Sequence, residues 1–367
     1  MAQWNRVPLI DYIELIGGGT PKTTVPEYWN GNIPWLSVKD FNNDKRYVYS
    51  TEKHISQSGF ENSPTKMLHK DDIIISARGT VGEIAMIPFD MAFNQSCYGI
   101  RASRGIDQPF LYYLLKNCIS QLKRMTHGSV FDTITRDTFA NIEVDIPDAE
   151  TQKRISSVLA DIDNKIEVND AINDNLEQQA QAIYFSMFID NPDPAWSHGH
   201  LSDLITVKYG KDHKKLADGI YPVYGSGGIM RYVERPLYNK ESVLIPRKGT
   251  LNNVIYVNQP FWSVDTMFYT EMKIPNVAKF VYHFVKAKDL ASMNAGSAVP
   301  SMTTDILNAM EVAIPSASAL EEFESLVAPM YEAMEANDVQ SKALSQMRDT
   351  LLPKLMSGEI DVSDVQL

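Results

Sequence analysis

The chain of 367 residues carries 34 Lys and Arg against 46 Asp and Glu, a formal net charge of -12, and only two cysteines. This length predicts two or three domains, and two cysteines exclude a disulfide-stapled scaffold and favour reduced thiols. The N-terminus lacks the pattern of a secretory signal and no apolar run approaches the roughly 18 residues that cross a bilayer, so we expect a cytoplasmic protein with no membrane partner.

The first glycine-rich segment, GGGTPK at residues 17 to 22, follows an apolar run and raises the question of a phosphate-binding loop. Such a loop needs two glycines flanking four residues, followed by Lys and Ser or Thr at the start of a helix. Pro21 and Pro26 surround Lys22, so no helix begins there and the pattern fails. We predict instead a turn that presents backbone N–H groups, Thr20 and Lys22 to a surface anion such as a DNA phosphate.

Further along the chain, β-rich segments appear twice. Residues 69–87 resemble residues 239–257, and each has an acidic turn, a short apolar strand, a basic residue and then Gly-Thr. Residues 109–125 and 276–293 each read as one helix. These patterns predict two mixed α/β bodies with curved sheets. The second body is about 20 residues shorter and shows no sequence counterpart to EYWNGNIPWLS, residues 27–37.

Each body ends in a repeated segment. HGSVFDTITRDTFANIEVDIP, residues 127–147, aligns without gaps on AGSAVPSMTTDILNAMEVAIP, residues 295–315, at an offset of 168 with eight identical positions. Self-similarity over this length predicts an internal duplication of the whole unit.

An acidic, heptad-patterned segment follows each repeat. Residues 148–190 hold nine acids and three bases, a net -6, and residues 318–364 hold ten acids and three bases, a net -7. Apolar positions in both segments alternate steps of four and three, which is the seam of a left-handed coiled coil. The negative net charge of the chain therefore comes from these two predicted helices. The two bodies are close to neutral, which permits each of them to have a basic face.

Both heptad seams turn polar at their midpoint, at Asn169 and Asn173 in the first helix and at Asn337 and Ser341 in the second. If the helices pack antiparallel, Asn169 meets Ser341 and Asn173 meets Asn337. A buried polar layer of this kind lowers stability but fixes the register. The alternative is two ordinary amphipathic helices that pack on globular bodies.

The second helix carries two further signals. Pro329 predicts a kink or a break, since proline removes a backbone donor and clashes with the preceding turn. Ser318 and Glu321 form the pattern of a capping box and predict the helix start.

The sequence shows no motif for catalysis, a cofactor or a metal. NPDPAW has Asp193 where an aminomethyltransferase needs its second proline, and GSGGIM at residues 225–230 opens no helix. The histidines of HGH at residues 198–200 are more simply a solvated linker than half of a zinc site. We therefore expect a chain that is catalytically silent.

Three stretches together resemble the specificity subunits of type I restriction-modification enzymes. GGGTPKTTVPEYWNGNIPWLSVKDF (17–41) resembles their opening, LEQQAQAIYFSMF (176–188) the end of their central helical region, and LLPKLMSGEIDV (351–362) their C-terminal region. The resemblance covers essentially the whole chain. It implies an α+β fold in which two α/β target-recognition domains with curved β-sheets are separated by two long antiparallel helices that form a coiled coil, with an internal pseudo-twofold repeat. The implied segments are target-recognition domain 1 (1–147), a central spacer helix (148–190), target-recognition domain 2 (191–317) and a C-terminal spacer helix and tail (318–367).

Sequence-specific DNA binding requires Arg or Lys together with Asn, Gln, Ser and Thr on loops. The candidates in the first body are Thr20, Lys22, Lys39, Arg78, Thr80, Arg101, Ser129 and Arg136. Those in the second body are Lys211, Lys214, Lys215, Tyr224, Ser226, Arg247, Lys248, Thr250 and Ser297. We expect phosphate contacts from Lys214, Lys215, Arg247 and Lys248, and a base contact from Arg78. An ordinary solvated side chain is the alternative for each.

The resemblance implies a non-catalytic subunit that binds double-stranded DNA, with each body reading one half of a split, asymmetric target. Two methyltransferase subunits would dock on the acidic helices and supply S-adenosylmethionine, base flipping and adenine methylation, and an ATP-driven endonuclease and translocase subunit would add cleavage. The alternatives are a coiled-coil adaptor that binds no specific DNA and a stand-alone methyltransferase, which would have to bind S-adenosylmethionine itself.

Overall fold

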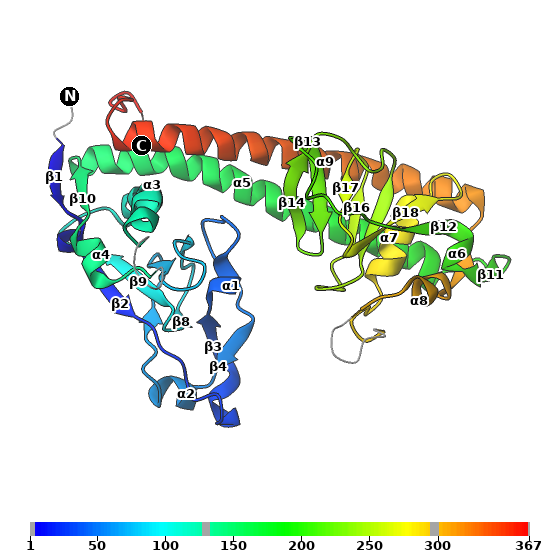
Figure 1. Cartoon of the computed structure of the whole chain (residues 1–367), viewed down its shortest axis with the longest axis horizontal. Helices are drawn as coiled ribbons and strands as arrows, with labels where there is room; N and C mark the ends of the chain where they lie inside the picture. The colour runs from blue at the N-terminus through cyan, green and yellow to red at the C-terminus, as the bar shows by residue number, and fades with distance from the viewer. Residues whose placement is uncertain (1–3, 127–132, 294–300, 366–367) are drawn as a thin grey trace. The chain divides into compact units, whose positions relative to one another are not determined.

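The computed structural model describes residues 4–126, 133–293 and 301–365 of the chain (Figure 1). The chain divides into two compact units. Unit 1 comprises Met1–Ala171 and Asn337–Leu367, and unit 2 comprises Ile172–Ala336. Each unit holds one globular body and part of each of two long helices. No helix in the described ranges combines the length and the apolar character needed to cross a membrane.

The first body is built on two four-stranded sheets, with strand orders β2-β9-β6-β7 and β4-β3-β8-β5, and on a separate antiparallel pair, β1 with β10. All pairs in the first sheet are antiparallel, whereas β3 and β8 run parallel in the second. The strands are β1 (Asn5–Pro8), β2 (Ile13–Gly17), β3 (Trp29–Leu36), β4 (Lys53–Ile55), β5 (Met67–Leu68), β6 (Ile73–Ser76), β7 (Ile84–Met86), β8 (Met91–Phe93), β9 (Cys97–Ala102) and β10 (Glu143–Ile146).

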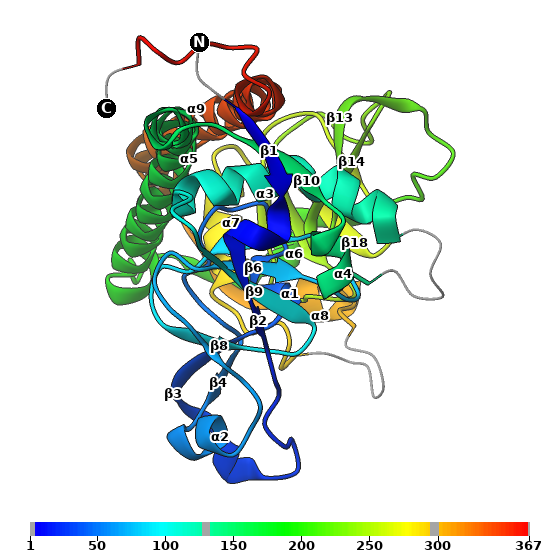
Figure 2. The same ribbon diagram turned by 90° about the vertical axis from the view of Figure 1, so that its left-hand side faces the viewer.

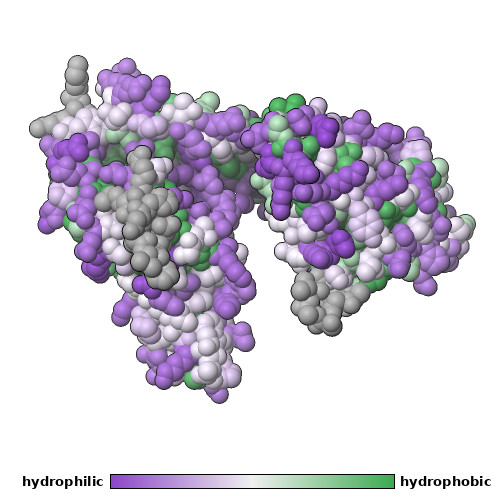
Figure 3. Space-filling model, viewed as in Figure 1, coloured by the Kyte–Doolittle hydropathy of each residue, from purple (hydrophilic) through white to green (hydrophobic). Residues whose placement is uncertain are grey.

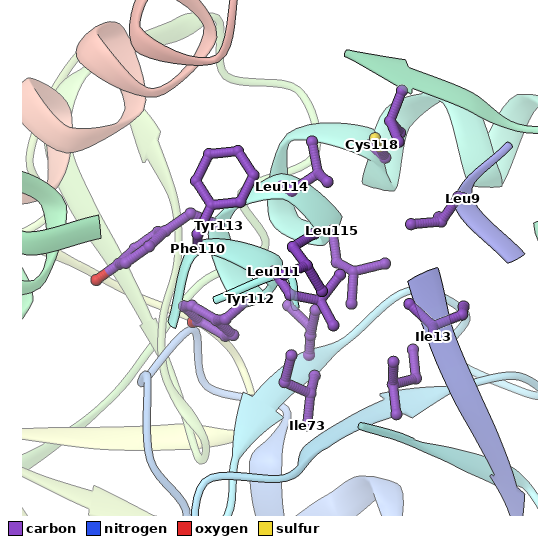
Figure 4. Close-up of a cluster of buried hydrophobic side chains, with 14 of the residues drawn as sticks. Leu9, Ile13, Ile73, Phe110, Leu111, Tyr112, Tyr113, Leu114, Leu115 and Cys118 are labelled. Atoms are coloured by element: carbon purple, nitrogen blue, oxygen red, sulfur yellow. The ribbon is translucent and has the colours of Figure 1, made fainter. Parts of the chain in front are cut away.

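One long helix, α3 (Gln108–Thr126), covers a face of the β2-β9-β6-β7 sheet (Figure 2). Figure 4 shows the α3 side chains gathered over Ile13 and Ile73 of that sheet. Leu111 and Leu115 are fully buried there, and burial of each such side chain contributes about 1.5–3 kcal/mol. The remaining helices of this body are η1 (Leu9–Tyr12), η2 (Pro26–Tyr28), α1 (Val38–Phe41), α2 (Gln57–Glu61) and α4 (Arg136–Ala140).

The second body repeats the strand order of the first, except that its second sheet has three strands and shows no strand counterpart to β5 within the described residues. Its sheets are β12-β18-β15-β16 and β14-β13-β17, with a separate antiparallel pair, β11 and β19. The strands are β11 (Ser197–His200), β12 (Ile205–Tyr209), β13 (Asp218–Gly225), β14 (Gly228–Val233), β15 (Ser242–Pro246), β16 (Ile255–Val257), β17 (Trp262–Ser263), β18 (Met267–Met272) and β19 (Glu311–Ile314). The helices of this body are α6 (Leu201–Leu204), α7 (Ala278–Lys286) and α8 (Thr304–Asn308).

The position of strand β13 corrects the expectation that the second body has no counterpart to residues 27–37. This strand pairs in parallel with β17, as β3 pairs with β8 in the first body. The second body therefore has a counterpart to the strand within residues 27–37, although the sequence predicts none. Strand pairing depends on backbone hydrogen bonds, so the position of a strand persists where its side chains differ.

Helix α7 is shorter than the predicted helix over residues 276–293. It ends at Lys286, and the chain then turns through Asp289. The Asp289 carboxylate accepts hydrogen bonds from Asn252 Nδ2 at 3.1 Å and from the backbone N–H of Ser292. These bonds offer the backbone an alternative to another helical turn.

The two long helices are α5 (Ala149–Tyr184) and α9 (Ala317–Met356), and a π-helical segment, η3 (Phe185–Asp190), continues α5. Helix α9 runs through Pro329, so the predicted break is wrong. Proline removes one backbone donor from the helix. The neighbouring Val327 is buried in the core of unit 2, and this packing holds the turn in place.

The start of α9 also differs from the predicted capping box. The helix begins at Ala317, and the hydroxyl of Ser316 accepts a hydrogen bond from the N–H of Ala319 at 3.2 Å. Ser316 thus has the cap role expected of Ser318, because its hydroxyl reaches a free N–H of the first turn.

Within unit 1, the two helices run antiparallel and share a buried ion pair. Arg348 of α9 lies 2.9 Å from Asp163 of α5, and both side chains are 3% exposed. Arg348 also lies 2.8 Å from Asp44 of the first body, and Asp163 accepts a hydrogen bond from Tyr113 of α3 at 2.7 Å. The ion pair therefore connects both helices to the body.

Asn169 of α5 is fully buried. Its Nδ2 atom donates to Gln340 at 2.9 Å and to the hydroxyl of Ser341 at 3.1 Å. The Ser341 contact is the one that the sequence predicts, and it is confirmed. In unit 2, Asn173 donates to the carbonyl oxygen of Met334 at 3.3 Å, while its predicted pairing with Asn337 stays a prediction.

The core of unit 2 contains a buried histidine. His283 of α7 is 2% exposed and stacks on Tyr184 of α5. Its Nε2 atom lies 2.9 Å from the hydroxyl of Tyr331 of α9. Burial lowers the pKa of His283 to about 4, because the charged ring would lose its hydration.

We predict that Arg348→Met lowers the free energy of unfolding by about 3–5 kcal/mol, because the substitution leaves Asp163 buried without its partner. Urea denaturation followed by tryptophan fluorescence measures this loss. Lys354→Met is the matched control, since Lys354 forms a half-exposed pair with Glu359 at 3.3 Å and its loss should cost less than about 1 kcal/mol. Equal losses in the two variants would contradict the assigned role of the buried pair.

A second prediction concerns pH. The folded-state pKa of His283 lies below the unfolded value of 6.5, so acidification below pH 6.5 protonates the unfolded chain first. Stability from this residue is therefore complete above pH 6.5 and decreases by about 1.4 kcal/mol per pH unit toward pH 4. His283→Gln should flatten this part of the profile in urea titrations at several pH values, whereas substitution of the exposed His198 should leave it unchanged.

Candidate nucleic-acid interface

In the first body, the loop between β6 and β7 presents Arg78 and Thr80. Gly79 between them has φ +78, a left-handed conformation that favours glycine. The backbone N–H groups of Ala77 and Arg78 both donate to the carbonyl oxygen of Ser96, at 2.8 and 3.2 Å. The loop is thus anchored by its backbone, while the Arg78 side chain is exposed and forms no hydrogen bond or ion pair with the described residues.

A pocket of about 410 Å³ opens beside this loop. It brings together three of the predicted DNA-binding residues, Lys39, Arg78 and Thr80. Its wall also includes polar residues that the sequence analysis missed, namely Ser37, Asn42, Lys53, Asn94 and Ser96. Trp35, Val38, Gly79 and Glu52 line it as well, and the Glu52 carboxylate lies 3.9 Å from Lys39 Nζ. Lysine, arginine, amide and hydroxyl groups converge here, which is the chemistry of phosphate and base-edge recognition.

Close packing explains two of the three glycines, Gly18 and Gly19. A Cβ on Gly18 would lie 2.0 Å from the backbone oxygen of Asn94, and one on Gly19 would lie 2.3 Å from the backbone nitrogen of Thr65. The N–H of Gly19 donates to the carbonyl oxygen of Phe93 at 2.9 Å. That donor is therefore occupied, which corrects the expectation that the loop offers it to an anion.

The polar side chains of the same loop differ in their availability. The Thr20 hydroxyl donates to Gln95. Lys22 is exposed and forms no ion pair with any described residue. Of these two side chains, Lys22 is thus the one left free for an external anion.

Two predicted residues of the first body serve the fold instead. Arg101 donates hydrogen bonds to both carboxylate oxygens of Asp72, at 2.8 and 2.6 Å, and this hydrogen bonding to Asp72 raises the pKa of Arg101. Arg136 donates to the carbonyl oxygen of Leu15 at 3.0 Å. Both guanidinium groups are occupied within the body, so we remove them from the candidate set. Ser129 and Ser297 lie outside the described residues.

The second body presents an equivalent loop between β15 and β16. Gly249 has φ +86, and the N–H groups of Arg247 and Lys248 both donate to the carbonyl oxygen of Thr266, at 2.9 and 3.2 Å. A Cβ on Gly249 would meet the Ser226 hydroxyl at 2.5 Å, which brings Ser226 beside this loop. Thr250 follows Gly249 and is exposed.

A lysine-rich loop after β12 is anchored to β17 of the β14-β13-β17 sheet. The N–H of Lys211 donates to the carbonyl oxygen of Ser263 at 2.8 Å, as the N–H of Gly19 does to Phe93 in the first body. The side chains of Lys211, Lys214, Lys215 and Lys248 are exposed and form no ion pair with the described residues.

Tyr224 is largely buried, so we drop it from the candidate DNA contacts. It is 7% exposed and packs on Phe261, with the ring centroids 6.2 Å apart. Strand β13 is buried on both faces from Pro222 to Gly225 and lies between β14 and β17, a position that the sequence alone did not reveal. A residue that the sequence analysis missed is Tyr209, whose exposed ring lies 5.4 Å from the Arg247 guanidinium.

These features limit the chemistry of the two bodies. Figure 3 shows that the displayed surface of each body is mainly hydrophilic, with hydrophobic residues in small separate areas. Within the described ranges, no group of three or more His, Cys, Asp or Glu side chains is arranged to hold a metal ion. Unpaired cations on backbone-anchored loops suit the binding of a polyanion, so the two bodies define a tandem pair of nucleic-acid-binding domains.

Comparison with known proteins identifies the family. The model of the type I restriction modification DNA specificity domain matches residues 1–178 and 195–323. The chain therefore belongs to this family, and it is a type I restriction-modification specificity subunit with two DNA specificity domains, as the sequence motifs predict.

Individual relatives match across most of the chain. The MjaIX specificity subunit of Methanocaldococcus jannaschii is 26% identical, covering 99% of this chain and 94% of the relative. The EcoprrI specificity subunit of Escherichia coli is 23% identical, covering 87% of each chain. The crystal structure of a type I S subunit from M. genitalium agrees in fold, with a TM-score of 0.56 at 18% identity and 96% coverage of both chains.

Two adjacent glycines allow a direct test of the packing at this interface. We predict that Gly18→Ala destabilises unit 1 by about 1–3 kcal/mol, because the new Cβ must displace the backbone at Asn94. Gly17→Ala is the matched control, since a Cβ there meets nothing within 4 Å. Thermal denaturation of both variants measures the difference, and equal melting temperatures would show that the loop is not held as described.

Proposed function

We propose that this chain is the non-catalytic subunit that recognises double-stranded DNA for a type I restriction-modification complex. Each body reads one half of a bipartite target. The observation that carries the proposal is the double match to the DNA specificity domain, together with a backbone-anchored loop of basic residue, Gly and Thr in each body. The backbone anchors are alike and the exposed side chains differ, which favours two different half-sites and an asymmetric target.

The exposed cations explain how an acidic protein binds DNA. A net charge of -12 repels DNA at long range, but screening limits this repulsion to about 8–10 Å at moderate salt. Lys22 and Arg78 in the first body and Lys211 and Lys248 in the second lack an acidic partner in the described residues. Such groups neutralise phosphates and release counterions locally.

We further propose that α5 and α9 form an antiparallel coiled coil that sets the unspecified gap between the half-sites. Asn169 and Asn337 are related by the same offset of 168 as the repeat, and so are Asn173 and Ser341, which supports a pseudo-twofold relation. The helices contain 36 and 40 residues, or about 54 and 60 Å at 1.5 Å per residue. Either length exceeds one DNA turn of about 34 Å.

The surfaces of the two long helices support docking of methyltransferase subunits. Acidic residues such as Asp161, Asp174 and Glu332 are exposed. Apolar side chains of the same helices are also exposed, with Val168 at 50% and Val339 at 66%. Exposed apolar groups within a charged surface are typical of protein interfaces. In this proposal the methyltransferase subunits supply S-adenosylmethionine and adenine methylation in the cytoplasm, and a restriction subunit adds ATP-dependent cleavage.

Salt dependence tests the DNA-binding surface. We predict that Lys211→Ala combined with Lys248→Ala weakens binding of the full chain, in complex with a methyltransferase subunit, to a randomised DNA duplex library. The slope of log affinity against log salt should decrease by about 0.9 for each phosphate that the protein no longer neutralises. The preferred half-sites should stay the same, because phosphate contacts carry no sequence information.

Lys240→Ala is the control for the loss of an exposed lysine elsewhere on this body, and it removes one positive charge where the double variant removes two. Lys240 is exposed and precedes β15, at the opposite end of that strand from Arg247. An unchanged slope in the double variant would remove these lysines from the interface. Binding by the wild-type complex with no sequence preference would instead favour the adaptor.

A further inference from the structure

The second body contains a stacked pair that the first body lacks. The Arg247 guanidinium carbon lies 5.4 Å from the centre of the Tyr209 ring, and the ring is 52% exposed. One guanidinium nitrogen of Arg247 donates to the carbonyl oxygen of Asp265 at 3.4 Å. The Tyr209 ring in turn packs edge-on against Phe268, with the centroids 5.0 Å apart, so the platform under the arginine is fixed.

The backbone of Arg247 is held on both sides. Its N–H donates to Thr266 and its carbonyl oxygen accepts a hydrogen bond from Met302, both at 2.9 Å. In the first body, Ala77 has the same pair of bonds, from its N–H to Ser96 at 2.8 Å and from Ile134 to its carbonyl oxygen at 3.0 Å. Ala77 is therefore the structural counterpart of Arg247.

The structural counterpart of Tyr209 in the first body is a glycine, Gly17. Tyr209 is the last residue of β12, opposite Phe268 of β18, and Gly17 is the last residue of β2, opposite Tyr98 of β9. A Cβ on Gly17 would meet nothing within 4 Å. The space that the stacked pair fills in the second body is thus open in the first. The backbones match at these positions, and only the side chains differ.

Stacking determines which DNA group suits this arginine. A guanidinium that lies over an aromatic ring holds its donors in one plane, and in Arg247 the side-chain donors other than the one bound to Asp265 form no hydrogen bond with the described residues. Guanine is the base that presents two acceptors, O6 and N7, to such a planar pair of donors in the major groove. A lysine lacks this geometry, so the neighbouring Lys248, exposed and without a partner in the described residues, suits a phosphate.

We propose that Arg247, positioned by Tyr209, reads a guanine in the half-site bound by the second body. This inference rests on the proposed function and adds a base identity to one half of the target. From the sequence, Arg247 is expected to contact a phosphate. This inference assigns it to a base edge instead, because its side chain is stacked and its backbone is anchored. The first body has no equivalent reader, since Ala77 and Gly17 stand in these places.

The test begins with the full chain in complex with its methyltransferase subunit. The wild-type complex selects its preferred sequence from a randomised duplex library, and 7-deazaguanine then replaces each guanine of the second half-site in turn. One replacement should weaken wild-type binding roughly 5-fold to 100-fold, because it removes the N7 acceptor. Arg247→Ala should bind weakly to both duplexes and show no further weakening with 7-deazaguanine.

Three variants separate the roles of charge, shape and stacking. Arg247→Lys keeps the charge but should lose the preference for guanine at that position. Tyr209→Phe should retain the preference, and Tyr209→Ala should reduce both the preference and the sensitivity to 7-deazaguanine. Arg235→Ala, which removes an exposed arginine after the end of β14, should leave the selected sequence unchanged.

The outcomes distinguish this inference from the function on which it rests. A wild-type complex without sequence preference would overturn both. A sequence-specific complex whose second half-site contains no guanine, or whose preference survives Arg247→Ala, would overturn the inference alone. Loss of preference at a position other than guanine would also contradict it.

Discussion

The arrangement of each body depends on two successive backbone N–H groups that share one carbonyl oxygen, from Ala77 and Arg78 to Ser96 and from Arg247 and Lys248 to Thr266. These bonds use no side-chain atoms. They hold a loop at the end of a sheet whatever side chains the loop carries, provided that glycine follows to supply the left-handed turn. The fold and the recognition surface are therefore specified by different atoms. Two bodies with little sequence in common can keep one architecture and bind different partners.

The distribution of charge follows the same division. Cations needed for the fold are paired, as Arg101 is with Asp72 and Arg348 is with Asp163. Arg78 and Lys248, on the anchored loops, form no ion pair among the described residues. An opposite charge at short range largely cancels the electrostatic potential of its partner. The unpaired charged residues therefore determine the sign of the surface potential that a ligand meets. The net charge of the chain describes mainly its helices.

Sequence patterns predicted much of this organisation. The offset of 168 and the polar midpoint of the seams identified the duplication and the Asn169–Ser341 contact, because both depend on spacing along the chain. Spacing along the chain does not predict which strands pair within a sheet. The counterpart of β3 was therefore missed, and Tyr224 was predicted to lie on the surface. The stacking of Arg247 on Tyr209 was missed for the same reason, since these residues are distant in sequence and meet only through β18. The break predicted at Pro329 was wrong because tertiary packing outweighed a local preference.

The buried Arg348 has a consequence for how such a chain changes through recombination. Its partners Asp163 and Asp44 lie 185 and 304 residues away in the sequence. A genetic exchange that replaced the first body alone would bring in a new loop opposite an unchanged C-terminal helix. An arriving segment without an acid at the place of Asp44 would deprive this cation of one of its anions. A first body could thus be exchanged without loss of stability only if it supplied an anion to this residue of α9.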